Sequence, residues 1–179
     1  VITWPPIMYT DYGLENYNNW IEMGGFDGIV IRPNGLVMKK LTKLCITNLM
    51  HPFQTFILGQ KNLAPKIAAK FGINLVFYGE NEAEYGNPIA ENYNSLRKKS
   101  YFTMRNSKDI YLAGIKLKDL ILKYKFNISD LNIFLPATLK EVKKTKLEIH
   151  YLGYYLKWIP QEAYYYAVKH CGFQPRPLR

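Results

Sequence analysis

The chain has 179 residues, of which 48% are hydrophobic and 21% charged, and this composition excludes a disordered tail and fits one ordinary domain. No apolar run is long enough to cross a membrane, and the two distant cysteines, Cys45 and Cys171, exclude a disulfide scaffold. Twenty-four Lys and Arg against 14 Asp and Glu give a formal net charge of +10. We therefore expect an anionic partner, namely nucleic acid, a nucleotide, acidic lipid or an acidic sugar. The alternative is a basic surface that only keeps the protein in solution.

Strand and helix signals alternate in the first half of the chain. Short apolar or β-branched runs predict three strands, at residues 1–4, 28–31 and 73–78. Apolar residues at helical spacing predict helices at residues 14–23, 36–49, 53–60 and 64–71. Thr10 or Asp11 is expected to cap the first of these helices, and Gly72 to end the last. The run at 28–31 is expected to be a buried strand.

This alternation predicts an α/β fold, in which helices flank one parallel sheet. In such sheets ligands bind beyond the carboxyl ends of the strands. These ends are expected at Trp4-Pro5, Arg32-Pro33 and the segment from Tyr78 to Asn81.

The second half of the chain is more basic and richer in aromatic residues. Residues 82–95 are predicted to form a long loop, 112–124 a basic amphipathic helix, 149–158 a strand, and 161–170 a final helix that begins after Pro160. Ser129 and Asp130 are expected to start a further short helix. We therefore expect two parts, a nucleotide-binding-like core at residues 1–95 and a mainly helical part at residues 96–179 packed on it.

Few residues carry a chemical signature in the sequence alone. Standard phosphate-binding, hydrolase and metal motifs are absent, and the histidines His51, His150 and His170 lie far apart. Each is interpreted as structural, Cys45 as a core residue and Cys171 as an incidental thiol. Aromatic side chains are frequent near the end of the chain: Tyr151, Tyr154, Tyr155, Trp158, Tyr164, Tyr165 and Tyr166. They either form a platform that binds sugars or bases or fill the core, and we expect at least half of them in the core.

The best-placed polar cluster follows the strand at 73–78. Gly79 lets a ligand approach the backbone, and the carboxylates of Glu80 and Glu84 suit Mg²⁺, which prefers carboxylate and phosphate oxygens. A solvated acidic loop is the alternative. Gln54 and Gln60 lie among apolar residues and either recognise a polar ligand or cap helix ends.

Several segments together resemble one family. These segments are Trp4-Pro5-Pro6, Phe26-Asp27 with Ile29-Val30-Ile31, His51-Pro52-Phe53-Gln54 with Gly59-Gln60, Tyr78-Gly79-Glu80-Asn81, Glu84-Tyr85-Gly86, Gly153-Tyr154-Tyr155, Pro160-Gln161-Glu162 and Tyr164-Tyr165-Tyr166. The chain resembles, over nearly its whole length, the N-acetyl sugar amidotransferases of surface-polysaccharide and flagellin-glycan biosynthesis, which include enzymes of pseudaminic acid biosynthesis.

The resemblance implies a pyrophosphatase-loop ATPase with an adenine nucleotide α-hydrolase-like, Rossmann-like fold that is incomplete at its N-terminal side. Such an enzyme uses ATP and Mg²⁺ to adenylylate the oxygen of a sugar acetamido group. Ammonia from glutamine or from a glutaminase subunit then displaces AMP and leaves an acetamidino group. The substrate is an acidic amino sugar, and the expected location is the cytoplasm.

The resemblance also implies roles for individual residues. Thr3 and Trp4 are expected near the adenosine, while Glu80 and Asn81 are expected to be catalytic, with Glu80 at the metal. The expected substrate-binding residues are Gln54, Gln60 and Glu84, together with Arg97, Lys98 and Lys99, whose positive charges would neutralise a sugar carboxylate.

One departure from the family is serious. The Ser-Gly-Gly-x-Asp-Ser loop that cradles pyrophosphate does not occur in this sequence. We therefore expect the chain to be an internal piece of a longer protein, without ATPase activity by itself and with a sheet edge open to oligomerisation. The alternatives are a tRNA-modifying ATPase of the same superfamily, although we expect no nucleic-acid partner, and a non-enzymatic basic binding module.

Overall fold

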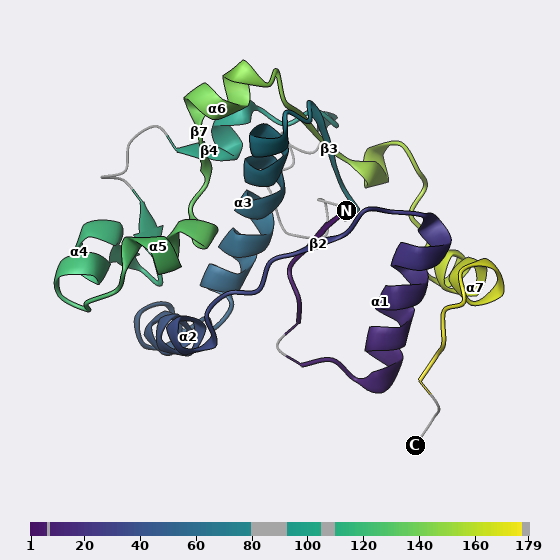
Figure 1. The fold of residues 1–179 in the computed structure, drawn as a ribbon, viewed down its shortest axis with the longest axis horizontal. Coiled ribbons are helices and arrows are strands. Elements are labelled where there is room, and N and C mark those ends of the chain that lie inside the picture. Colours follow the sequence, from purple (N-terminus) through teal and green to yellow (C-terminus); the bar gives the residue numbers. More distant parts are fainter. Residues whose placement is uncertain (7, 80–92, 105–109, 177–179) are drawn as a thin grey trace. The chain divides into compact units, whose positions relative to one another are not determined.

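The structure is a computed structural model that describes residues 1–6, 8–79, 93–104 and 110–176, with only the backbone of Lys99. It divides into two compact units, which are described separately (Figure 1). The first unit contains Val1–Arg32 and Leu156–Arg179, and the second contains Pro33–Tyr155. The expected division into residues 1–95 and 96–179 stays a prediction.

The first unit contains a parallel strand pair joined through a helix. Strands β1 (Ile2–Thr3) and β2 (Ile29–Val30) pair in parallel, and α1 (Asp11–Gly24) connects them. Thr10 caps α1 as predicted, because its hydroxyl accepts a hydrogen bond from the Gly13 amide at 3.1 Å. The prediction that residues 28–31 are buried is wrong, since Val30 is 45% exposed.

The C-terminal helix α7 (Pro160–His170) belongs to the same unit and begins, as predicted, with proline in its first turn. Beyond it, the chain is tied to α1 through Asn16. The Asn16 amide nitrogen donates to the Gln174 carbonyl at 2.9 Å, and the Gln174 amide donates back to the Asn16 side-chain oxygen at 2.6 Å.

The second unit begins with two long helices, α2 (Gly35–Leu49) and α3 (Gln54–Phe71). Along α2 a stripe of apolar residues is buried, Val37, Leu41 and Cys45, which confirms Cys45 as a core residue. The two predicted helical stretches between 53 and 71 form the single helix α3, which continues through a buried Pro65 and ends at the left-handed Gly72.

After α3, strand β3 (Leu75–Tyr78) pairs in parallel with β8 (Glu148–Tyr151). The register places Val76 opposite Ile149 and Tyr78 opposite Tyr151, so these four side chains share one face. Val76, Ile149 and Tyr151 belong to a buried hydrophobic cluster with Ala68, Phe102, Ala137, Val142 and Leu147, and Tyr78 packs against it.

The remaining elements of the second unit are short. They are η3 (Lys99–Tyr101), β4 (Thr103–Met104), β5 (Tyr111–Leu112), β6 (Ile115–Lys116), α4 (Leu117–Leu122), α5 (Ile128–Leu131), η5 (Asn132–Phe134), β7 (Ala137–Thr138), α6 (Leu139–Lys144) and η6 (Leu152–Tyr154). Strands β4 and β7 pair in parallel, and β5 and β6 in antiparallel.

The protein is thus mixed α/β with small parallel sheets, but the three predicted strands do not form one sheet. Within the described ranges, β1 pairs with β2, whereas β3 pairs with β8, and each sheet has two strands. β1 and β2 are only two residues long, which leaves little backbone for a further partner.

The basic helix predicted at residues 112–124 is found only in part, as α4 (Leu117–Leu122), because a hairpin precedes it. Ala113 and Gly114 both have positive φ angles, 54° and 74°, and make the turn of the β5–β6 hairpin before α4 begins. A side chain at Gly114 would come within 2.9 Å of Leu49, so this position requires glycine. The Gln54 side-chain oxygen accepts from the Ala113 amide at 2.8 Å, and Asn48 donates to the Ala113 carbonyl at 3.1 Å. These contacts stabilise the turn in place of helical hydrogen bonds.

Two predictions about the aromatic segment are also corrected. The strand expected at residues 149–158 ends at Tyr151, because η6 follows at once. Of the seven aromatic residues expected mainly in the core, only Tyr151 is buried and Tyr154 packs partly against the core. The other five are exposed: Tyr155, Trp158, Tyr164, Tyr165 and Tyr166.

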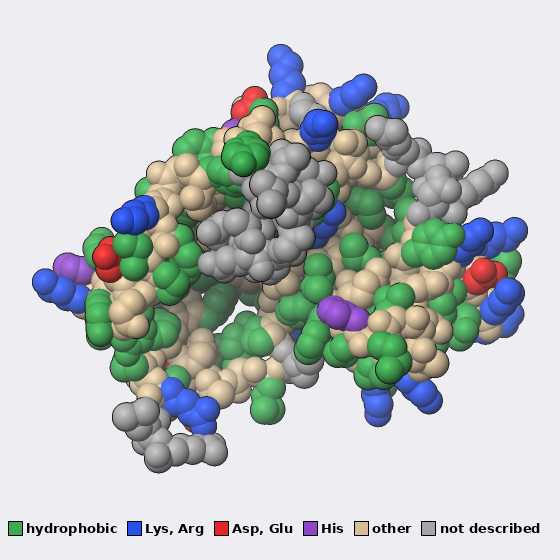
Figure 2. All heavy atoms as spheres, turned by 180° about the vertical axis from the view of Figure 1, so that it is seen from behind, with side chains coloured by type: hydrophobic (Ala, Val, Ile, Leu, Met, Phe, Trp, Pro, Cys, Tyr) green, Lys and Arg blue, Asp and Glu red, His purple; other side chains and the backbone are tan. Residues whose placement is uncertain are grey.

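Four lysines near α6 lie at the surface of the second unit. Lys140, Lys143, Lys144 and Lys146 are all exposed on and after α6. On the face shown in Figure 2, the basic side chains are dispersed among hydrophobic ones. Among the helices that the structure describes, none has the length and apolar character needed to cross a membrane.

A capping box at the start of α6 gives a test of the fold. The Thr138 amide and hydroxyl donate to the Glu141 carboxylate at 2.7 and 2.6 Å, and these hydrogen bonds lower the pKa of Glu141. We expect Thr138→Ala to reduce the free energy of unfolding by about 1 kcal/mol at pH 7. Because the folded-state pKa is lowered, this stabilisation is present above the unfolded pKa and is lost as the pH falls through the folded one.

Urea denaturation at pH 7 and pH 3 measures this effect. Thr47→Ala is the matched control, since the Thr47 hydroxyl only donates to the Lys43 carbonyl within α2. Equal destabilisation by Thr138→Ala at both pH values would contradict the role of the Glu141 carboxylate.

Candidate functional site

An aromatic stack lies at the carboxyl ends of β3 and β8. Tyr78, the last residue of β3, stacks between Phe102 and Tyr151, the last residue of β8. The ring centroids are 5.7 Å apart for Tyr78–Phe102 and 5.3 Å apart for Tyr78–Tyr151, with interplanar angles of 11° and 22°. The Tyr78 hydroxyl also donates to the Lys61 carbonyl on α3 at 2.5 Å. These contacts hold the strand ends rigidly where a parallel sheet typically binds ligands.

Arg97 extends this stack with a positive charge. Its guanidinium carbon lies 5.9 Å from the centre of the Tyr151 ring, and the residue is only 8% exposed. The backbone explains the position: Leu96 forms an antiparallel bridge with His150, and the Arg97 amide donates to the Ile149 carbonyl at 3.1 Å. The structure therefore brings Arg97 to the carboxyl ends of β3 and β8. In the sequence, Glu80 and Asn81 follow shortly after the end of β3.

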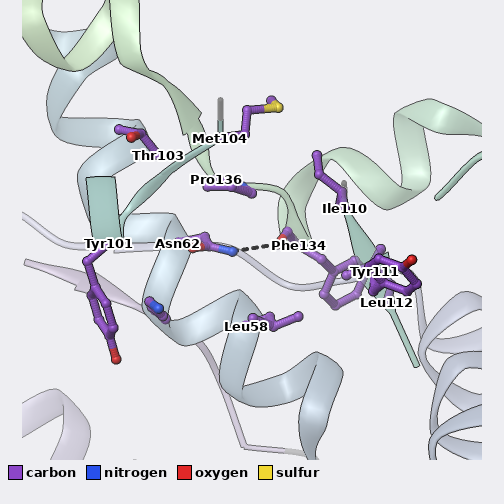
Figure 3. Close-up of a pocket in the computed structure, with 11 residues that line it drawn as sticks. Leu58, Asn62, Tyr101, Thr103, Met104, Ile110, Tyr111, Leu112, Phe134 and Pro136 are labelled. Atoms are coloured by element: carbon purple, nitrogen blue, oxygen red, sulfur yellow. Dashed lines mark hydrogen bonds between the residues drawn. The ribbon is translucent and has the colours of Figure 1, made fainter. Parts of the chain in front are cut away.

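A pocket of about 360 Å³ opens beside the stack in the same unit (Figure 3). Residues of α3, of the segment around β4, of β5 and of the chain before β7 line it. Figure 3 shows how Asn62 on α3 reaches across to Phe134, and the Asn62 amide nitrogen donates to the Phe134 carbonyl at 2.8 Å. This buried hydrogen bond fixes one wall of the pocket.

The pocket combines apolar walls with a few polar groups, which is typical of small-molecule sites. The Lys61 ammonium lies 3.2 Å above the centre of the Tyr101 ring, in a cation–π contact. The Thr103 hydroxyl is buried and has no hydrogen-bond partner among the described residues. Lys61 and Tyr101 line the pocket, so it offers a positive charge and an aromatic ring to a ligand.

Lys66, one turn further along α3 from Asn62, has a structural role instead. Its ammonium donates to the carbonyls of Asn132 and Leu135 at 2.5 and 3.1 Å. Burial lowers the pKa of Lys66, and the nearby Glu141 carboxylate opposes this effect. The contacts tie η5 to α3 and so position Phe134 at the pocket.

The structure places other predicted site residues as follows. Thr3, at the end of β1, is half-buried, with its hydroxyl 3.5 Å from that of Tyr17, and Trp4 follows it. Gln54 uses its side-chain oxygen to stabilise the Ala113–Gly114 turn. Gln60 is exposed on α3. Their proposed ligand contacts stay predictions.

The acidic candidates cannot be placed in this way. Glu80, Asn81 and Glu84 lie outside the described residues, as does the side chain of Lys99, while Lys98 is exposed. Within the described ranges, no three His, Cys, Asp or Glu side chains come together to hold a metal ion.

Sequence reasoning missed the pocket and the stack. Lys61, Asn62 and Thr103 lie in an unremarkable helix and a two-residue strand, and Tyr78 was interpreted only as a strand end. What these residues share is that a polar or aromatic residue stands on a buried face, where an apolar residue is expected. This signal becomes visible only once the pairings of β3 with β8 and of β4 with β7 are known.

No family model matches the sequence, and no curated protein matches it.

The buried Thr103 hydroxyl gives a test of the pocket. An unsatisfied buried hydroxyl costs free energy, so we expect Thr103→Val to raise the free energy of unfolding by about 1 kcal/mol. Thr55→Val is the matched control, because the fully buried Thr55 hydroxyl has the Cys45 sulfur as a partner at 3.8 Å and its removal should not stabilise the fold. Denaturant unfolding of both variants measures the difference, and a comparable loss of stability in both would disprove the unsatisfied hydroxyl.

Proposed function

We propose that the chain is the substrate-binding part of a cytoplasmic, ATP-dependent sugar amidotransferase. The enzyme converts the acetamido group of an acidic amino sugar to an acetamidino group. The observation that carries the proposal is Arg97, a buried cation at the carboxyl ends of two parallel strands and directly beside the segment that continues to Glu80 and Asn81.

The physical argument starts from the charge of the substrate. A guanidinium binds a carboxylate through two parallel hydrogen bonds, and burial strengthens the attraction because less water screens it. The Tyr151 ring, which is itself stacked on Tyr78, supports Arg97, so that little conformational freedom is lost when an anion binds. The pocket in the same unit, with Lys61 and Tyr101 in its lining, combines a ring face with polar groups, a mixture that suits a sugar.

The chemistry requires ATP because an amide oxygen is a poor leaving group. ATP transfers its adenylyl group to that oxygen and releases pyrophosphate, so that ammonia can then displace AMP from the amide carbon. In this proposal Glu80 holds Mg²⁺, and Glu80 and Asn81 act at the reacting phosphate. Thr3 and Trp4 lie on the adenosine side.

Binding of an acidic amino sugar tests the role of Arg97 directly. We expect Arg97→Gln to weaken the binding of N-acetylneuraminic acid at least tenfold, since a charge-assisted hydrogen bond is worth roughly 1.5–3 kcal/mol. Calorimetric titration measures this loss, and Arg97→Lys, which keeps the charge, should retain part of the affinity. Lys143→Gln, an exposed cation on α6, is the control. Equal binding by wild type and Arg97→Gln, with unchanged circular dichroism, would exclude Arg97 as the anion site.

A second expectation concerns the nucleotide. We expect this chain by itself not to cleave ATP, because the sequence contains no pyrophosphate-binding loop. In the longer enzyme that carries such a loop, Glu80→Ala should abolish amidine formation and Gln60→Ala should reduce it. Release of pyrophosphate and mass spectrometry of the sugar measure the two steps. ATP cleavage by the present chain, or an unchanged rate in Glu80→Ala, would contradict these roles.

A further inference from the structure

The whole net positive charge of the chain lies in the second unit. Of the 24 Lys and Arg, 19 belong to Pro33–Tyr155, against 9 of the 14 Asp and Glu, and the first unit contains five of each kind. The described part of the second unit contains only four acidic residues: Asp119, Asp130, Glu141 and Glu148. Three of their carboxylates contact a residue two to four positions away in the chain. Few acidic side chains are therefore left among the described residues to neutralise the lysines of this unit.

Six exposed lysines lie on α6 or next to the elements that α6 contacts. The helix packs against α3, β4, β7 and η3. Residues three and four positions apart share one side of a helix, so Lys140 lies beside Lys143 and Lys144. Several basic side chains project at the top of the view in Figure 2, where α6 lies. We call the six lysines the α6 surface: Lys70 in the last turn of α3, Lys98 before η3, and Lys140, Lys143, Lys144 and Lys146 on and after α6.

An aromatic ring borders the α6 surface. Tyr101 belongs to η3, which contacts α6, and its amide donates to the Lys98 carbonyl at 2.9 Å. The residue is 37% exposed and lines the pocket shown in Figure 3. Its ring meets the Phe102 ring edge to face, with a centroid distance of 4.9 Å, and the Lys61 ammonium lies above it. Tyr101 is therefore a fixed and accessible ring beside a group of cations.

The chemistry of the α6 surface indicates the kind of partner that it fits. Ammonium groups bind the phosphates of a nucleic acid, and an aromatic ring stacks on any nucleobase. A membrane presents its charges in one plane and an acidic peptide carries no base, so neither would use a ring in the wall of a pocket. In a duplex the bases stack on one another, whereas a single strand leaves them available for a protein ring.

We propose that the second unit binds single-stranded nucleic acid, with the phosphates on the α6 surface and one base against Tyr101 at the pocket. This binding is a further activity of the chain and does not depend on the proposed function. It departs from the expectation that nucleic acid is not a partner. Arg97, the proposed carboxylate site, is not part of the α6 surface.

The salt dependence of binding tests the α6 surface in the chain itself. Fluorescence anisotropy measures the affinity for a labelled oligouridylate of about 16 nucleotides. Each phosphate contact with a single strand contributes about 0.7 to the slope of log affinity against log salt concentration. We expect the triple variant with Lys140→Gln, Lys143→Gln and Lys144→Gln to weaken binding and to reduce this slope by about two.

A second triple variant is the matched control. Lys39, Lys40 and Lys43 are exposed on α2, which lies beside the opposite end of α3 from α6 (Figure 1). Their replacement by Gln removes the same charge, and we expect the slope of the wild type to be kept. Equal effects of the two triple variants, or no binding by the wild type at low salt, would overturn the proposal.

The role of the ring is tested separately. We expect Tyr101→Leu to weaken binding about tenfold without changing the slope, because base stacking releases no counterions. Tyr124→Leu is the control, since Tyr124 is 46% exposed after α4 and does not line the pocket. Thermal unfolding establishes that both variants are folded. Wild-type affinity in folded Tyr101→Leu would exclude the stacked base.

Competition identifies the class of partner. We expect polyglutamate and phosphatidylserine vesicles, at equal concentrations of charge, to displace the labelled strand less effectively than unlabelled oligouridylate does. Equal displacement by polyglutamate would assign the α6 surface to an acidic peptide, and equal displacement by vesicles would assign it to a membrane. Either result would overturn the proposal.

Discussion

The parallel pairing of β3 with β8 is the constraint on which the second unit depends. It joins segments more than 70 residues apart, since Leu75 lies opposite Glu148. The pairing places Tyr78 against Tyr151, and Arg97 reaches the stack only because its segment pairs with the free edge of β8. The core, the stack and the proposed anion site therefore form together, and a substitution that weakens this pairing would disturb all three.

The register of the same pairing places the apolar and the polar side chains of β8 on opposite faces of the sheet. Alternate side chains of a strand point to opposite faces, so Ile149 and Tyr151 enter the core while Glu148 and His150 do not. A slip of one residue would bury Glu148 and His150 and expose the apolar pair. The burial of Ile149 thus specifies the register and, with it, the position of His150 beside Tyr155. Packing on one face determines the polar geometry on the other.

The sequence predicted those elements whose signals are local. The ends of α1, α3 and α7 follow from Thr10, Gly72 and Pro160, residues that act on the backbone within one turn. The β5–β6 hairpin could not be predicted in this way, because Asn48 and Gln54, which stabilise its turn, lie 65 and 59 residues away from Ala113. The partner of β3 and the contact between Ser95 and Tyr155 are equally non-local. The same reason explains why His150 alone suggested only a structural role.

Arg97 and Lys98 show how burial changes the strength with which a cation attracts an anion. They are neighbours with the same formal charge, and the family resemblance implies that both face a sugar carboxylate. Arg97 is 8% exposed and packs on Tyr151, whereas Lys98 is exposed, where water and salt screen its field. An anion gains most from the cation that water screens least, provided that the anion can reach it. In the proposed function, selection of an acidic substrate would therefore depend on the single guanidinium of Arg97, and most of the net charge of +10 would act only on the approach of the ligand.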